Sequence, residues 1–187
     1  MRIAKKSALT LFLIGLSFVG TTAAVASDHT AQENAVSLAA LPPGAQLQEL
    51  KRYFRKVVGA QGDHMSGQYL PYGYDYHYKL EGTLAFTSST WFPNSHLMYS
   101  CILPAPDPSI YADFFTSTDE NCEGRTKFTA HPTLGYVSST QIEGTVPLIR
   151  CLITTPGTGQ MNHYDAVGDN CGNSNAVKEG ILGYVFL

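Results

Sequence analysis

Three stretches of the chain share one motif at a near-constant spacing, and this repetition is the main indication of how the chain folds. Residues 84–90 read LAFTSST, residues 134–140 read LGYVSST, and residues 182–185 at the C-terminus read LGYV. The leucines that open these stretches are 50 and 48 residues apart. Self-similarity at such a period is typical of a domain built from repeated supersecondary units.

Two further motifs recur in the same order at the same period. The first reads LKRY at 50–53, MYSC at 98–101 and LIRC at 148–151. The second reads DHMS at 63–66, DFFT at 113–116 and NHYD at 162–165. Three motifs in one order indicate three repeats, which we number along the chain and place at about 46–94, 95–144 and 145–187.

The repeats have the composition of β-strands. Residues 148–154 (LIRCLIT) are apolar and β-branched and are bounded by Pro147 and by Pro156-Gly157, and residues 180–186 (GILGYVF) are similar in composition. Residues 47–58 also fit the spacing of an amphipathic helix, but their counterparts in the other repeats favour strand. We therefore expect an all-β, pseudo-threefold, β-trefoil-like fold, because closure removes free sheet edges. A small irregular barrel or a three-bladed arrangement is the alternative.

The four cysteines fall at two repeat positions. Cys101 and Cys151 share one position, Cys122 and Cys171 share the other, and the first repeat lacks both. A joint absence is what a bond inside each repeat predicts, because a cysteine without its partner has no use. Of the three pairings that four cysteines allow, we therefore expect Cys101–Cys122 and Cys151–Cys171. No CxxC or HxxxH spacing points to a metal site instead.

The first 26 residues have the features of a secretory signal peptide. A basic start (MRIAKK) precedes an apolar run over 8–19, and AVA at 24–26 offers a cleavage site. We interpret residues 27–45 as a linker or tail. No later segment has the roughly 20 apolar residues of a membrane span. The sequence therefore predicts a secreted or periplasmic protein, in which disulfides persist.

Length and charge restrict the possible partners. The chain has 187 residues, enough for one ordinary domain, and a formal net charge of -3. Without the predicted signal peptide, nine basic and fifteen acidic residues remain, which gives a net charge of -6. Nucleic-acid binding calls for a basic surface, so we expect no nucleic-acid partner.

The composite repeat resembles an uncharacterised repeat family of secreted bacterial and fungal proteins, whose units look like LYRC…GDHF…CEG…EGLLGYV. The resemblance covers about 46–187, and the third repeat carries it with Leu148, Arg150, Cys151, His163, Cys171, Glu179, Gly180 and 182–185. The second repeat departs from the pattern, with Phe114 in place of His and His131-Pro132 in place of Glu-Gly. Such repeats are often appended to extracellular hydrolases and have no known catalytic activity, so the resemblance implies a secreted binding module.

The chain carries no familiar catalytic motif, and we expect no catalytic residue, metal or cofactor. It has neither GxSxG nor HExxH. Asp63-His64 and Asn162-His163 recur at one repeat position and are candidate ligand-binding residues. The alternative is that Asp or Asn caps a turn while His bonds to backbone in a half-buried position. Phe114 at the same position favours this structural role.

Tyr72, Tyr74, Tyr76 and Tyr78 fall at every second residue. On an extended strand they would share one face, and a row of phenol rings suits stacking on sugars or on a protein. The alternative is that the rings pack over the core or replace the missing disulfide. The basic residues of 51–56 (KRYFRK) are similarly open to two interpretations, an acidic-ligand patch or a solvated face.

Together these features predict a monomeric, secreted protein that binds a carbohydrate or cell-wall glycan without catalysing a reaction. A protein-directed factor is the second hypothesis, for example a protease inhibitor that presents the loop at 104–108 (PAPDP). A hydrolase with an unrecognised site is the third.

Overall fold

The computed structural model describes residues 41–56, 62–104, 112–157 and 159–187. This part of the chain is all-β, as predicted, and contains no α-helix. Its strands are β1 (Leu47–Arg55), β2 (Asp63–Gly67), β3 (Lys79–Ser88), β4 (Ser95–Leu103), β5 (Asp113–Ser117), β6 (Thr126–Lys127), β7 (Thr133–Ser138), β8 (Thr145–Thr154), β9 (Met161–Val167) and β10 (Val177–Phe186). One 3₁₀ turn, η2 (Cys122–Gly124), lies between β5 and β6.

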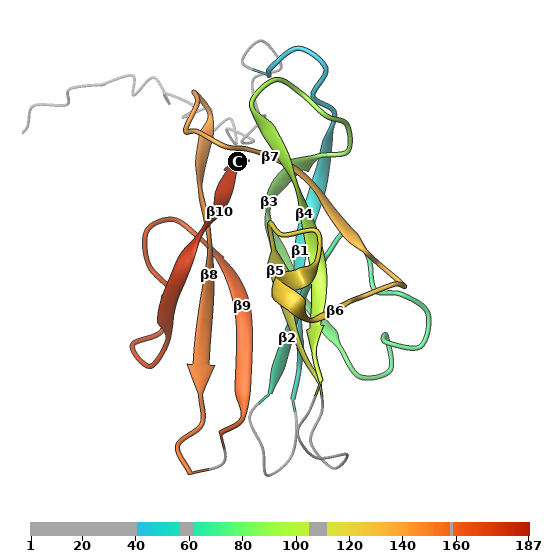
Figure 1. The fold of residues 1–187 in the computed structure, drawn as a ribbon, viewed down its shortest axis with the longest axis vertical. Helices are drawn as coiled ribbons and strands as arrows, with labels where there is room; N and C mark the ends of the chain where they lie inside the picture. The colour runs from blue at the N-terminus through green and yellow to red at the C-terminus, as the bar shows by residue number, and fades with distance from the viewer. Residues whose placement is uncertain (1–40, 57–61, 105–111, 158) are drawn as a thin grey trace, which may run out of the picture. The chain divides into compact units, whose positions relative to one another are not determined.

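Each repeat forms antiparallel pairs around its first strand. β1 pairs with β2 and β3, β4 pairs with β5, β6 and β7, and β8 pairs with β9 and β10. In Figure 1, β8 runs between β10 and β9. The first strand is thus hydrogen-bonded on both edges, and β1 confirms the strand interpretation of residues 47–55 over the helical one.

The last strands of the repeats meet in a ring of single residue pairs. The pairs are Phe86 with Phe186, Tyr136 with Ser88, and Tyr184 with Ser138. Each last strand pairs with one neighbouring last strand through the third residue of the repeated motif, which is Phe86, Tyr136 or Tyr184. It pairs with the other neighbour through the fifth residue, which is Ser88, Ser138 or Phe186. All ten strands thereby join into one antiparallel network. The trefoil-like arrangement itself stays a prediction.

A buried apolar cluster joins the three repeats. Leu50, Met98 and Leu148 hold the same position in the three first strands, and all three are fully buried. Leu134 and Leu182, which open the repeated motif of the last strands, pack in the same cluster. Each repeat therefore buries its apolar face against the other two rather than within itself.

Both predicted disulfides are confirmed. The Cα atoms of Cys101 and Cys122 are 5.6 Å apart, and those of Cys151 and Cys171 are 5.8 Å apart. Each bond ties the first strand of its repeat to the loop that follows the second strand. The loop that carries Cys171 lines the groove between the third and first repeats.

Several predicted features lie outside the described residues. They are the signal peptide at 1–26, most of the linker at 27–45 and most of the loop at 104–108. Within the described ranges, no helix has the length and apolar character needed to cross a membrane.

Candidate functional site

The second strands β2, β5 and β9 come together, and each contacts the other two. Hydrogen bonds link the three strands in a cycle. In each bond, the side chain of the Asp or Asn that opens the strand's motif accepts the backbone N–H of the second motif residue in another repeat. Asp63 accepts from Phe114 at 3.3 Å, Asp113 from His163 at 2.9 Å, and Asn162 from His64 at 3.1 Å. The repeated Asp or Asn therefore joins neighbouring repeats.

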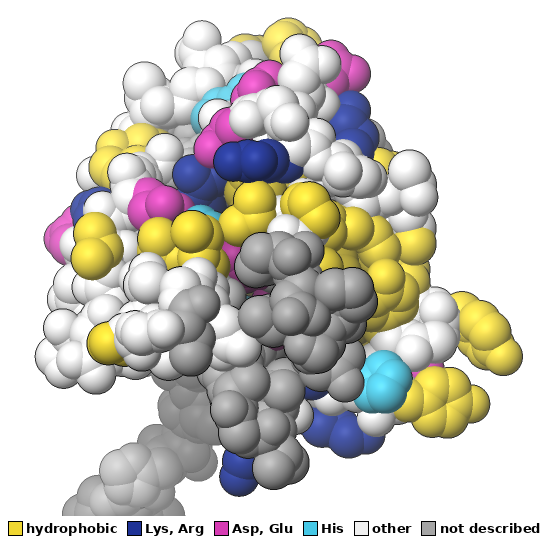
Figure 2. Space-filling view, turned by 60° about the horizontal axis from the view of Figure 1, so that its bottom comes forward, with side chains coloured by type: hydrophobic (Ala, Val, Ile, Leu, Met, Phe, Trp, Pro, Cys, Tyr) yellow, Lys and Arg dark blue, Asp and Glu magenta, His cyan; other side chains and the backbone are white. Residues whose placement is uncertain are grey.

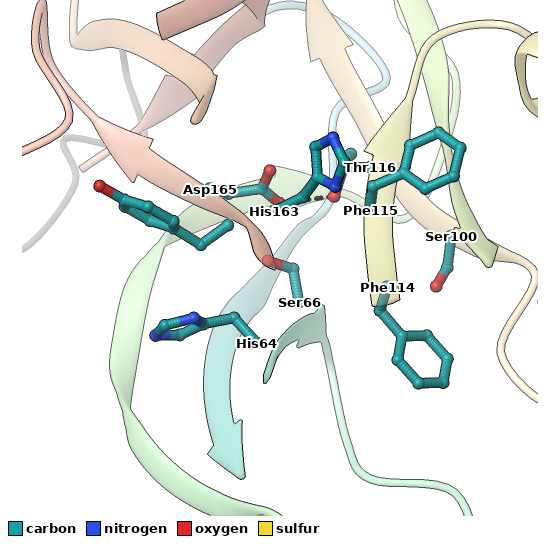
Figure 3. A pocket seen from close by; sticks show the side chains of 9 residues that line it. His64, Ser66, Ser100, Phe114, Phe115, Thr116, His163 and Asp165 are labelled. Atoms are coloured by element: carbon teal, nitrogen blue, oxygen red, sulfur yellow. Dashed lines mark hydrogen bonds between the residues drawn. The ribbon is translucent and has the colours of Figure 1, made fainter. Parts of the chain in front are cut away.

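A small cavity lies between these three strands (Figure 3). Ser66, Thr116 and Asp165, which are equivalent in the three repeats, line it, and the Thr116 hydroxyl donates to the Asp165 carboxylate at 2.5 Å. Asp165 is buried, and burial raises its pKa. The cavity has a volume of about 10 Å³, roughly the space of one water molecule, so it is too small for an organic ligand.

The two repeated histidines have equivalent Nδ1 partners with opposite effects on their pKa values. Nδ1 of His64 lies 3.0 Å from Oδ1 of Asn162, and Nδ1 of His163 bonds the Asp113 carboxylate. Burial lowers the pKa of His64, and the neutral Asn162 does not reverse this. Burial also lowers the pKa of His163, but the hydrogen bond and charge of Asp113 outweigh it, so that this pKa is raised.

The other ring nitrogen of each histidine faces a glutamate. Nε2 of His64 lies 3.5 Å from Glu81, and Nε2 of His163 lies 3.4 Å from Glu179. Both nitrogens of each ring thus face oxygen atoms of the protein. Through these contacts each ring joins two repeats.

The variant Asp113→Asn tests this assignment, because Asn162 already holds the equivalent position. The pKa of His163 is raised in the folded protein, so its bond to Asp113 stabilises the fold fully below about pH 6.5, the pKa of an unfolded histidine. This stabilisation is lost as the pH rises through the pKa of His163 in the folded protein. We expect the variant to lose about 2 kcal/mol of unfolding free energy at pH 5.5 and progressively less at higher pH. Urea unfolding from pH 5.5 to 9 measures this; a loss that grows with pH would contradict it.

In the second repeat Phe114 stands where the others have histidine, and Asp63 has other partners there. The Tyr78 hydroxyl donates to the Asp63 carboxylate, and Nη2 of Arg55 lies 3.4 Å from it. Burial raises the pKa of Asp63 to about 7, against the opposing effects of Tyr78 and Arg55. Asp63 is therefore a buried, bonded carboxyl group at a contact between repeats.

The prediction that Tyr72, Tyr74, Tyr76 and Tyr78 share one strand face is wrong. Residues 72–77 form turns between β2 and β3, because the chain reverses here instead of extending. Tyr72 and Tyr76 are 97% and 74% exposed, whereas Tyr78 is only 1% exposed. Tyr74 and Tyr78 pack on Phe114, with ring centroids 5.9 and 6.1 Å away. These two rings therefore pack over the core, which was the alternative interpretation of the tyrosine row.

Arg52 in β1 and Arg150 in β8 hold the same repeat position and make equivalent bonds. Nε of Arg52 donates to Glu81 at 2.6 Å, and Nε of Arg150 donates to Glu179 at 2.7 Å. Nη1 of each arginine donates to a backbone carbonyl of a second strand in another repeat, at 3.1 and 2.9 Å. Each guanidinium also lies over an aromatic ring, at 5.7 and 5.3 Å from its centroid.

Most of the basic stretch at 51–56 is accordingly paired with acidic side chains. Lys51 pairs with Glu49 at 2.7 Å, and Arg52 and Arg55 pair with the acids named above. Figure 2 shows a face on which Lys and Arg side chains lie beside Asp and Glu side chains, with hydrophobic side chains around them. This face is mixed in charge rather than uniformly basic.

The loop after each second strand covers the contact with another repeat, and its residues differ. In the second repeat, Glu123 places its carboxylate on Arg150. In the first repeat, the loop places Tyr74 against Phe114 in an edge-to-face contact. In the third repeat, Gly172 follows the cysteine as Glu123 does in the second, and it has no side chain to offer.

The third and first repeats consequently leave a groove between them, which we call the open groove. Its volume of about 450 Å³ lies within the range of small-molecule sites. Arg52 and His64 line it from the first repeat, and Ile153, Tyr164, Ala166, Val167, Asn170, Cys171, Gly172 and Asn173 line it from the third.

The structure thus brings some of the predicted site residues together and separates others. Asp63, His64 and His163 all lie where the second strands meet, but only His64 also reaches the open groove. The exposed Tyr72 and Tyr76 do not line it. Of the lining residues of the third repeat, the sequence pattern identified only Cys171, as a disulfide partner. The signal that would have found them is the substitution of Gly172 for Glu123 between aligned repeats.

Comparisons with protein-family models, curated proteins and solved structures find no match to this chain. Among the described residues, no group of three or more His, Cys, Asp or Glu side chains is arranged to hold a metal ion.

Proposed function

We propose that the protein is an exported, non-catalytic binding protein and that the open groove binds a carbohydrate or cell-wall glycan. One observation carries the proposal. Of the three equivalent contacts between repeats, side chains of the protein fill two, and the third leaves a groove of about 450 Å³. Two confirmed disulfides and the predicted signal peptide support an extracellular location.

The lining of the groove supports a ligand rich in hydroxyl groups. Asn170 and Asn173 are exposed, and each uses its side-chain oxygen to accept a backbone N–H of its own loop, at 3.0 and 2.9 Å. Their amide NH₂ groups remain as donors. Ile153 and Val167 add apolar surface. A few placed polar groups on an apolar wall are the usual composition of a small-molecule site.

The polar groups at the repeat contacts support binding over catalysis. His64 and His163 face protein oxygens with both ring nitrogens. The Thr116 hydroxyl donates to the buried Asp165. A hydrolase needs a nucleophile beside a base that is free to accept its proton, and these residues are arranged differently.

We also propose that the three repeats are pseudo-equivalent units of the secreted repeat family that the sequence resembles. The ring of last-strand pairs and the cycle of Asp or Asn hydrogen bonds both relate equivalent positions, which supports this proposal. Because each repeat contributes a small sheet built on its own first strand, the arrangement favours the three-bladed alternative over the β-trefoil.

The variants Asn170→Ser and Asn173→Ser test the groove. The serine hydroxyl can still accept the backbone N–H of its loop, but the amide donors are lost. On an array of neutral and acidic cell-wall oligosaccharides, we expect the wild type to bind at least one class. We expect the double variant to bind it about tenfold more weakly, through the loss of one or two hydrogen bonds.

Asn121→Ser is the matched control, because Asn121 precedes the cysteine of the second repeat as Asn170 does in the third. It should bind like the wild type. Absence of binding to every oligosaccharide and to isolated cell walls would overturn the proposal. Inhibition of secreted proteases would then favour a protein-directed function.

A further inference from the structure

At the contact between the second and third repeats, an arginine holds a carboxylate. This arrangement is the template for the open groove. Oε1 of Glu123 lies 2.7 Å from Nη1 of Arg150, and its Oε2 lies 3.2 Å from Nη2. The Ser117 hydroxyl donates to Oε1 at 2.8 Å. Hydrogen bonds from Arg150, opposed by partial burial, lower the pKa of Glu123, so the group held here is a carboxylate. Arg150 holds it while its Nε remains bonded to Glu179.

The open groove has the same arginine without the carboxylate. Arg52 keeps the Nε bond to Glu81 and the Nη1 bond to a backbone carbonyl, as Arg150 does. Within the described part of the chain, its Nη2 has no hydrogen-bond acceptor. Both groups that complete the template are missing, because Gly172 stands for Glu123 and Ala166 stands for Ser117.

The space that the missing carboxylate would fill is open. A Cβ atom built on Gly172 meets no atom within 4 Å, and both Gly172 and Ala166 line the groove. The backbone is comparable at this one position, since Glu123 has φ +55° and Gly172 has φ +66°. The third repeat thus lacks the two side chains that contact the arginine in the second repeat.

We propose that the open groove binds an acidic sugar, a uronic acid, with the sugar carboxylate on Arg52 where Glu123 lies on Arg150. This inference rests on the proposed glycan-binding function and specifies its ligand class. A planar guanidinium can bind a carboxylate through two parallel hydrogen bonds, and the precedent at Arg150 has this two-point geometry.

The surroundings favour one carboxylate on a sugar over a polyanion. The chain without its predicted signal peptide has a net charge of -6, which repels a densely charged ligand. Asn170 and Asn173 suit the hydroxyl groups of the same sugar ring. Glu81 already balances the charge of Arg52, so recognition depends on geometry as much as on net charge.

Binding of methyl β-D-glucuronide, its methyl ester and methyl β-D-glucoside, measured by calorimetry and by amide NMR shifts, tests the proposal. We expect the acid to bind at least about tenfold more tightly than the ester or the glucoside. Arg52→Gln should remove that preference, and Arg125→Gln, at an exposed arginine outside the groove, should not. Equal binding of all three sugars in the groove would overturn the uronate proposal and leave glycan binding intact. Tighter binding of an N-acetylated glutamate peptide would overturn both.

A second experiment builds the template into the groove. In Ala166→Ser/Gly172→Glu, the new glutamate should lie on Arg52, its pKa should fall below the ordinary value, and glucuronide binding should drop more than about tenfold. Ala166→Ser/Gly172→Gln carries the same backbone strain without the charge and should weaken glucuronide binding less than the glutamate variant does. A glutamate that titrates normally would overturn the carboxylate site whatever the glycan results.

The reciprocal variant Ser117→Ala/Glu123→Gly should open an equivalent groove on Arg150. We expect the number of glucuronide molecules bound per chain to rise from one to two. A stoichiometry that stays at one in a folded variant would overturn the equivalence of the two arginines. This variant also carries the test if the glutamate insertion does not fold.

Discussion

Replacing Leu148 by alanine should cost about 3–5 kcal/mol of unfolding free energy, the range measured for large-to-small changes in a well-packed core. Leu148 is fully buried and lies in the cluster that contains an equivalent residue from each repeat. The cavity left by the substitution would lie between repeats, where no single sheet can close it by moving alone. Because a domain of this size has a total stability of roughly 5–15 kcal/mol, the effect is a large part of the whole.

Met98→Leu is the matched control for this prediction. Met98 is equivalent to Leu50 and Leu148, so the substitution makes the three positions identical. A volume-conserving swap of this kind costs less than about 1.5 kcal/mol. Urea unfolding with the disulfides intact measures both variants. If Leu148→Ala lost no more than Met98→Leu, the three repeats would not share one core.

The repeat spacing predicted the all-β fold and the disulfides because both depend on relations between equivalent positions. The joint absence of cysteines in the first repeat was enough to pair Cys101 with Cys122 and Cys151 with Cys171. The helical spacing of 47–58 was misleading, since β1 has neighbours on both edges and its ladder hydrogen bonds come from residues distant in sequence. Such partners are invisible in a local pattern.

The strand interpretation of the tyrosine row fails for a related reason. Alternation predicts a strand only where a partner strand exists, and residues 72–77 have none, because they form turns after Pro71. Tyr78 is then drawn inward by its hydrogen bond to the buried Asp63. Phe114 permits this arrangement, because it leaves one oxygen of Asp63 without the histidine partner that Asp113 has in His163.

The open groove was beyond the reach of motif reasoning because it results from missing side chains. Motif searches find residues that are present, whereas this site follows from Gly172 and Ala166 in place of Glu123 and Ser117. It also combines Arg52 from the first repeat with residues of the third, more than 100 positions later in the chain. Their proximity follows from the cyclic contact of β2, β5 and β9.

Replacing Gly135 by alanine should cost about 2–5 kcal/mol, from the backbone strain and the overpacking that it introduces at the ring of last strands. Gly135 has φ +92°, which L-residues rarely adopt. A Cβ atom here would lie 2.5 Å from Nε2 of Gln48, 2.5 Å from Oγ1 of Thr87 and 2.9 Å from the backbone oxygen of Ser88. The first of these can move aside, but the last is backbone of the neighbouring repeat. The glycine of the LGYV motif is thus required by the close approach of two last strands.

The first repeat supplies the control, because Ala85 stands at the equivalent position and is buried without a glycine. Ala85→Gly should cost only about 0.5–1 kcal/mol, the entropic penalty of glycine within a strand. Urea unfolding gives both values. Amide hydrogen exchange should show faster exchange in β3 and β7 of Gly135→Ala, where Tyr136 pairs with Ser88. Unchanged stability of this variant would mean that the ring can widen at no cost, and the close approach would then not explain the glycine in the repeated motif.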